Sequence, residues 1–248
     1  MSPMSGPTVA VIVAHPDDET LWAGGAVLIH PEWCCSIFAL CRARDPDRAP
    51  RFERVARALG AAGSRMADLD DGPEQLPLSI SEVAEAIFGL ITGVPELRAG
   101  AGRAGGPAEI GAVGAGTQAR ESSGGPPAFD LIITHSPQGE YTRHLRHEEV
   151  SRAVIALLRS GRIATRELWL FAYEDEQRRS YPRAIPVAPL QLLLPEEIWR
   201  RKYEIMTVLY GFSPESWEAR TTPSSEAFWR FEDATTAALA FDVEGDNA

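Results

Sequence analysis

The chain has 248 residues, a hydrophobic content of 44% and a net charge of −11. These values are typical of one globular domain, and the negative charge argues against a surface that binds the phosphates of nucleic acid. The cysteines, Cys34, Cys35 and Cys41, are too few and too clustered for a disulfide framework, so we expect a cytoplasmic protein. No apolar stretch of the sequence is long enough to span a membrane.

The apolar, β-branched run at residues 8–14 is typical of a central parallel strand that is buried on both faces. Residues 19–29, which follow this strand, are predicted to form a helix. Ser79 and Glu82 form a capping-box pattern that predicts a helix running to about residue 91. The other predicted elements, in chain order, are a strand at 33–41, a helix at 47–59, a short strand at 65–69, a strand at 129–134, a helix at 148–159, strands at 167–173 and 187–193, and a helix at 195–209.

Strands that alternate with helices predict a mainly parallel sheet with right-handed crossovers and helices on both faces. We therefore expect a single α/β domain over residues 1–248. Residues 97–127 depart from this pattern, because they are rich in Gly, Ala, Pro and Ser and lack apolar periodicity. We interpret them as a flexible insertion or lid within the domain, since strand-like sequence resumes directly afterwards.

Four of the five histidines stand in two clusters, and each cluster follows a predicted strand. His15 follows the first strand in the sequence His-Pro-Asp-Asp-Glu, and His135, His144 and His147 follow the strand at 129–134. In an open α/β sheet, ligands bind at the carboxyl ends of the strands. We therefore expect the two clusters to meet at one metal site with a spare carboxylate beside it.

His15 and Asp18 are three residues apart across a turn that Pro16 stiffens. Both side chains can then bind one ion while Asp17, between them, points elsewhere. His147 is the third expected ligand. An unligated acid next to a metal-bound water is suited to act as a general base, and we expect Asp17 to have that role.

The two remaining histidines of the clusters have different expected roles. His144 precedes His147 by three residues and would flank the open coordination position, where it could stabilise an oxyanion or protonate a leaving amine. Three roles fit His135, at a strand end: metal ligand, partner of a metal ligand, or substrate contact. Zn²⁺ is the expected ion, and Fe²⁺ is the alternative because two histidines and one carboxylate also describe non-haem iron enzymes.

The run Ala-His-Pro-Asp-Asp-Glu at residues 14–19, with Thr20-Leu21 and Gly24-Gly25 after it, resembles the signature of the PIG-L family, also called LmbE-like deacetylases. The resemblance implies a Rossmann-like fold and a zinc-dependent hydrolase that removes an N-acyl group, usually acetyl, from an amino sugar or sugar conjugate. It implies zinc binding by His15, Asp18 and His147, a general base at Asp17, and an assisting role for His144.

Weaker similarities to the family extend the resemblance from residue 8 to about residue 210, without residues 97–127. We take five residues as candidate substrate contacts: Arg51, Asp71, Tyr141, Trp22 and His135. The second motif departs from the family, which commonly has His-Pro-Asp-His where this chain has His144-Leu145-Arg146-His147. Arg143 and Arg146 add positive charge there, which indicates either an anionic substrate or two solvated arginines.

The function that we expect is therefore N-deacylation of a small amino-sugar substrate, without a nucleic-acid partner and compatible with a homo-oligomer. One alternative is an Fe(II) enzyme that uses the same two histidines and one carboxylate. Another is a metal- or sugar-binding module of the same fold that lacks catalysis, against which Asp17 argues because a purely structural site has no use for an unligated acid. A dinucleotide-binding enzyme is excluded because no Gly-x-Gly-x-x-Gly follows the first strand.

Overall fold

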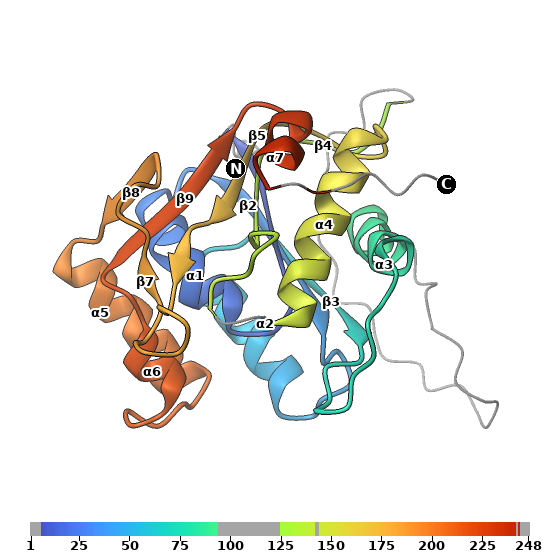
Figure 1. The fold of residues 1–248 in the computed structure, drawn as a ribbon. Helices are drawn as coiled ribbons and strands as arrows, with labels where there is room; N and C mark the ends of the chain where they lie inside the picture. Colours follow the sequence, from blue (N-terminus) through green and yellow to red (C-terminus); the bar gives the residue numbers. More distant parts are fainter. Residues whose placement is uncertain (1–5, 94–124, 142–143, 242, 244–248) are drawn as a thin grey trace, which may run out of the picture.

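A seven-stranded sheet, with the strand order β3-β2-β1-β4-β5-β9-β8, forms the centre of the molecule (Figure 1). The structure is a computed structural model that describes residues 6–93, 125–141, 144–241 and 243. The strands of the sheet are β1 (Thr8–Val13), β2 (Cys34–Cys41), β3 (Gly63–Leu69), β4 (Ala128–Thr134), β5 (Ala164–Phe171), β8 (Leu190–Leu193) and β9 (Ser225–Phe231). The first five strands in the sheet order are parallel, and β9 and β8 continue the sheet in antiparallel pairing.

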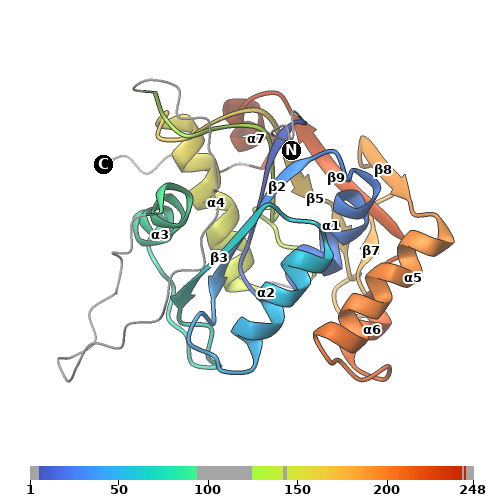
Figure 2. The same cartoon turned by 180° about the vertical axis from the view of Figure 1, so that it is seen from behind.

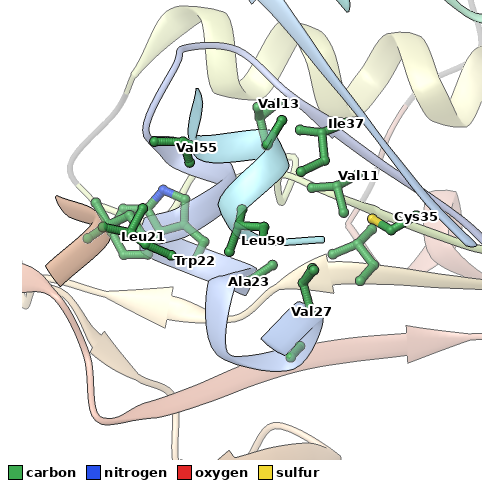
Figure 3. Packing of buried hydrophobic residues seen from close by; sticks show 14 of the residues in the cluster. Val11, Val13, Leu21, Trp22, Ala23, Val27, Cys35, Ile37, Val55 and Leu59 are labelled. Carbon is green, nitrogen blue, oxygen red and sulfur yellow. The ribbon is translucent and has the colours of Figure 1, made fainter. Parts of the chain in front are cut away.

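Helices cover both faces of the sheet (Figures 1 and 2). On β1, Val9, Val11 and Val13 point into one apolar cluster, and Ala10 and Ile12 point into the other. Figure 3 shows the first of these clusters, which joins the sheet to α1 and α2; α3 and α4 pack on the second. The helices are α1 (Asp18–Ile29), α2 (Arg48–Ala58), α3 (Ile80–Thr92), α4 (Leu145–Arg159), α5 (Glu196–Glu204), α6 (Trp217–Thr221) and α7 (Ala234–Ala240).

This architecture confirms the predicted α/β fold with a mainly parallel sheet and helices on both faces. The predicted capping box is present, since the Ser79 hydroxyl accepts from the Glu82 amide and the Glu82 carboxylate accepts from the Ser79 amide. Most of the proposed insertion lies outside the described residues. No helix in the described part of the chain combines the length and hydropathy that a membrane span requires.

The predicted helix at residues 195–209 is interrupted. The α-helix α5 ends at Glu204, and Ile205–Leu209 form a π-helix in which the Tyr210 amide donates to the Ile205 carbonyl at 3.0 Å. The wider turn keeps Ile205 buried while it turns Tyr210 toward the start of α1, where the Tyr210 hydroxyl bonds Glu19. A hydrophobic pattern alone cannot show such a change of helix type.

An ion pair in the core anchors α1 to the antiparallel end of the sheet. Lys202 on α5, the only lysine in the sequence, and Glu226 on β9 are both fully buried, with 2.6 Å between Nζ and Oε1. The same carboxylate accepts the amides of Gly25 and Ala26 at 2.7 Å each. A Cβ at Gly25 would lie 2.5 Å from Leu194 and 2.8 Å from the Glu226 carboxylate, so only glycine fits this position of α1.

We expect Lys202→Met to lower the free energy of unfolding by about 3 kcal/mol, because it leaves the Glu226 carboxylate buried without its cation. Urea denaturation measures this loss. Lys202→Met combined with Glu226→Gln should recover part of it, since no buried charge then remains. Arg200→Met is the matched control on the same helix: it breaks an exposed pair with Glu196 and should cost less than about 1 kcal/mol. A Lys202→Met protein as stable as Arg200→Met would contradict the role of the pair.

Candidate active site

Donor atoms from His15, Asp18 and His147 meet at the carboxyl ends of β1 and β4, which are neighbours in the sheet. His15 Nδ1 lies 3.1 Å from Asp18 Oδ2 and 3.2 Å from His147 Nε2, and the last two atoms are 3.3 Å apart. In a tetrahedral zinc site with ligand distances of about 2.0–2.1 Å, neighbouring ligand atoms lie about 3.3 Å apart. The three donors therefore have the spacing of one face of such a site.

Further hydrogen bonds orient these donors. The Trp22 indole donates to Asp18 Oδ1 at 3.1 Å, and the backbone amide of His15 donates to Asp18 Oδ2 at 2.8 Å. His147 Nδ1 lies 2.6 Å from Glu140 Oε2, so Nε2 is the nitrogen that faces the other two donors. A carboxylate behind a histidine in this way fixes the ring and raises its basicity as a ligand. The sequence analysis missed Glu140, because no spacing rule marks an acid within a loop as the partner of a later histidine.

His135 lies behind His147 and is fully buried. Its Nε2 accepts the Ala14 amide at 2.9 Å, its Nδ1 lies 3.0 Å from Glu140 Oε2, and its ring stacks on His147 with 3.9 Å between centroids. Both ring nitrogens are thus engaged and neither reaches the pocket. The structure places His135 outside the pocket lining, in the position of a partner of His147.

The electrostatics of the donor cluster favour a cation. Burial alone would lower the pKa of His147, but the facing carboxylates of Asp18 and Glu140 outweigh it and raise that pKa to about 10. Burial would raise the pKa of Asp18, yet the adjacent histidines hold it well below its usual range. Asp17 is different: burial and the like charges of Asp18 and Glu19 raise its pKa well above the ordinary value.

Asp17 occupies a strained backbone position, with φ at 114°. Its amide donates to Glu19 Oε2 at 3.0 Å, and Glu19 Oε1 accepts the hydroxyls of Thr20 at 2.6 Å and Tyr210 at 2.7 Å. The buried Glu19 carboxylate therefore ties the strained turn to the π-helix. With the chain held in this way, Asp18 faces the donor cluster while Asp17 lines the adjoining pocket.

This catalytic pocket has a volume of about 220 Å³. His144 lines it, and His144 Nδ1 is buried without a hydrogen-bond partner in the described part of the chain. Burial and the neighbouring His147 and His15 lower the pKa of His144 to about 3, so its imidazole is neutral. The other residues lining the pocket are His15, Pro16, Asp17, Asp18, Leu21, Arg42, Arg48, Asp71, Tyr141, Trp217 and Glu218.

Two expected substrate contacts, Asp71 and Tyr141, do line the pocket. Asp71 accepts from Arg42 Nε at 2.5 Å, and the Tyr141 ring lies 4.9 Å from that of Trp217. Trp217 was not anticipated, because it belongs to a five-residue helix outside the predicted elements. Trp22, in contrast, is fully buried with its indole N–H on Asp18, so the expectation that it contacts substrate is wrong.

Arg51 is also not in the pocket. Its Nε donates to Asp47 at 2.7 Å and its Nη1 donates to the Tyr210 carbonyl at 2.8 Å, so it links α2 to the π-helix. Arg48, almost one turn earlier on α2, lines the pocket instead. Its guanidinium lies 4.6 Å from the Phe212 ring centroid, and its Nη1 is buried with no hydrogen-bond partner among the described residues.

Arg146 of the second motif has a structural role and does not indicate an anionic substrate. Arg146 is fully buried and donates to the carbonyls of Asp70 at 2.6 Å and Leu76 at 2.9 Å, as well as to Glu149. It therefore fixes the loop after β3 against α4. Arg143 lies outside the described residues.

Neither a family model nor a curated protein matches the sequence. Solved structures do match the fold. The N,N'-diacetylchitobiose deacetylase of Pyrococcus horikoshii has a TM-score of 0.59 and 14% identity over 92% of this chain and 85% of that one. The A40926 pseudoaglycone deacetylase Dbv21 has a TM-score of 0.52 and 15% identity over 92% of this chain and 98% of that one. The chain has the LmbE-like fold of these structures. GalB, a 4-carboxy-2-hydroxymuconate hydratase of Pseudomonas putida, matches this chain with a TM-score of 0.52 and 16% identity over 87% of this chain and 83% of GalB. The fold alone therefore does not define the reaction.

We expect Tyr210→Phe to lower the free energy of unfolding by about 1–3 kcal/mol, because the buried Glu19 carboxylate loses one of its donors. Urea denaturation checks this. Tyr203→Phe is the control: Tyr203 packs on Trp199 in the same helical segment, and its hydroxyl bonds no other described residue. Equal stability of the two variants would show that the Tyr210–Glu19 bond does not support the Asp17 turn.

Proposed function

We propose that the protein is a metal-dependent hydrolase that removes an N-acyl group, in the first place acetyl, from an amino sugar or a sugar conjugate. The observation that carries this proposal is the triangle of donors from His15, Asp18 and His147 beside Asp17, an acid that lines the same pocket. The deacetylases among the structures of similar fold support it.

His15, Asp18 and His147 would hold the ion, which we propose to be Zn²⁺, with Fe²⁺ as the alternative for the same donors. Bound there, a divalent ion supplies Lewis acidity toward an amide carbonyl and lowers the pKa of a water molecule. The donor chemistry fits this assignment, since two neutral imidazoles and one carboxylate leave a net positive site. Glu140 then serves as the carboxylate that orients His147.

Asp17 is the proposed general base. It accepts a proton from the water whose oxygen attacks the amide carbon, and it passes that proton to the nitrogen as the C–N bond breaks, which yields a free amine and a carboxylate. The raised pKa of Asp17 makes it a stronger base than an exposed aspartate. The neutral His144 imidazole can donate an N–H to the negative charge that develops on the carbonyl oxygen.

The pocket walls suit a sugar ring. Tyr141 and Trp217 offer apolar ring faces, while Asp71 and the unpartnered Nη1 of Arg48 offer an acceptor and a donor for hydroxyl groups. We propose Tyr141, Asp71, Arg48 and Trp217 as the substrate contacts.

The GalB likeness favours a second candidate, a hydratase that adds water across the double bond of an unsaturated acid. The same base and ion would activate water for that addition. A panel of N-acetylated amino sugars, assayed for released primary amine, and of unsaturated hydroxy acids, assayed for loss of conjugated absorbance, separates the two reactions. Oxygen-dependent turnover with bound iron would instead support the iron alternative, and metal binding with no turnover would support a binding module.

We expect Asp17→Asn to keep one bound metal ion and to lower kcat for deacetylation by roughly 10²–10⁴-fold, because the base is gone while the three ligands remain. Amine release and metal content by atomic emission give the two readouts. Asp47→Asn, at an exposed acid that precedes α2 and lies outside the pocket lining, should change neither. Wild-type turnover by Asp17→Asn would remove Asp17 from the mechanism.

We expect Glu140→Gln to weaken metal affinity by about 10–100-fold, since His147 loses the carboxylate that orients it. Competition with a chromophoric chelator measures the affinity. Glu85→Gln, the same change at a surface acid paired with Arg162, is the control and should bind metal like the wild type. Unchanged affinity in Glu140→Gln would contradict the assignment of His147 as a ligand.

A further inference from the structure

A second cavity lies directly beside the catalytic pocket. It has a volume of about 620 Å³, and it shares Tyr141, His144 and Trp217 with the catalytic pocket as lining residues. The catalytic pocket alone, at about 220 Å³, is smaller than typical ligand sites of roughly 300–1,000 Å³, whereas the adjoining cavity falls within that range. The two volumes together fit a substrate that extends beyond one sugar ring.

The outer wall of this cavity comes from the connection between β6 (Tyr173–Glu174) and β7 (Arg183–Ala184). Figures 1 and 2 show β7 close to α6, the helix that begins with Trp217. Within the connection Glu176, Gln177 and Arg178 have φ angles of 50°, 61° and 68°. Three consecutive left-handed residues without glycine are strained, and such strain clusters at functional sites.

The connection presents donors to the cavity. Arg178 and Arg179 both line it, and neither side chain makes a hydrogen bond or ion pair with another described residue. Ser180 also lines it, and its hydroxyl oxygen is buried without a hydrogen-bond partner in the described part of the chain. Asp175 is the acid in the lining, so two arginines and one acid leave a charge of +1 in a protein whose net charge is −11.

The lining of this cavity also contains aromatic rings. Tyr141 and Trp217 continue from the catalytic pocket, and Tyr181 adds a third ring. Trp217 and Tyr181 are 38% and 41% exposed, so both rings have surface left for a ligand. The cavity therefore combines ring faces with guanidinium groups that bond no other described residue, and arginine forks match the planar oxygens of phosphates and carboxylates.

We propose that this cavity binds an anionic group, a phosphate or a carboxylate, on the part of the substrate that is linked to the N-acyl amino sugar. This inference rests on the proposed deacetylase function, which it narrows to negatively charged sugar conjugates. A dianionic phosphate or a carboxylate forms hydrogen bonds with guanidinium groups in which both partners are charged, whereas a neutral sugar hydroxyl does not. Two guanidinium groups in the lining therefore suit an anionic group better than a sugar hydroxyl.

Calorimetric titration of the amine products tests the proposal without requiring turnover. The ligands are glucosamine 1-phosphate, 4-carboxyphenyl glucosaminide and the uncharged phenyl and methyl glucosaminides. We expect one or both charged ligands to bind the wild type roughly tenfold more tightly than their uncharged counterparts, with the advantage shrinking as salt is added. The two charged ligands also distinguish a phosphate site from a carboxylate site.

Arg178→Gln combined with Arg179→Gln should bring the ratio of charged to uncharged affinity close to one. Arg166→Gln combined with Arg183→Gln removes the same charge from exposed positions outside the cavity lining and should keep the wild-type ratio. Equal affinities for charged and uncharged ligands in the wild type, no measurable binding of the charged ligands, or an unchanged ratio in the first double variant would each overturn the proposal.

The same ligand set separates failure of this inference from failure of the proposed function. If the protein deacetylates amino sugars but binds charged and uncharged ligands equally well, the proposed function is supported and the anion site is rejected. If the protein binds charged ligands more tightly but releases no amine from any substrate, the anion site is supported and the deacetylase function is rejected.

Discussion

The arrangement of the site depends on the burial of consecutive carboxylates between the end of β1 and the start of α1. Asp18 and Glu19 are almost fully buried, and Asp17 borders the pocket. Burying a carboxylate costs several kcal/mol unless partners replace the lost water. The two acids have different partners: Asp18 is matched by imidazoles and the Trp22 indole, and Glu19 by the hydroxyls of Thr20 and Tyr210. Asp17 has no such set among the described residues, and burial together with the charges of Asp18 and Glu19 raises its pKa, which suits the proposed role of general base.

The proposed roles of these acids require a fixed position of α1. The Glu226 carboxylate takes two amides from the middle of the helix and is itself neutralised by Lys202. One turn before those amides, the Tyr173 hydroxyl donates to the Trp22 carbonyl at 3.1 Å. Glu226 on β9, Lys202 on α5 and Tyr173 on β6 contribute no atom to the donor triangle, yet they set the position of Asp18 relative to His147 on α4. Rigid elements of this kind keep a site within the tolerance that catalysis needs.

The sequence predicts the part of the site that follows from strand order. Apolar runs identify β1 and β4, and parallel strands bring the residues after them to one edge, so His15 and His147 could be expected to meet. The sequence does not predict which neighbouring element a helical side chain contacts when other elements pack on both faces of the helix. Trp22 and Arg51 were assigned to the substrate, but α1 is buried all round at Trp22, and the carbonyl freed by the π-helix at Tyr210 captures Arg51. Glu140 bonds both His135 and His147. Its position depends on the path of the loop from β4 to α4, and the local sequence of a loop has no periodic pattern that would predict this path.

The residues proposed to select a substrate lie on different parts of the fold from those proposed to hold the ion. The proposed donors stand just after β1, on α1 and on α4, whose positions the parallel sheet dictates, whereas Arg178 and Tyr181 stand on the connection from β6 to β7 and Trp217 stands on α6, all of them after β5. The turn at residues 176–178 lies between β6 and β7, which pair with each other, and it is costly in itself, since left-handed conformations of residues other than glycine each cost about 1–2 kcal/mol. A relaxed turn of the same length would join β6 to β7 without that cost. The strained turn carries Arg178 and contributes it to the cavity lining together with Arg179, in keeping with the tendency of strained backbone to lie at functional sites.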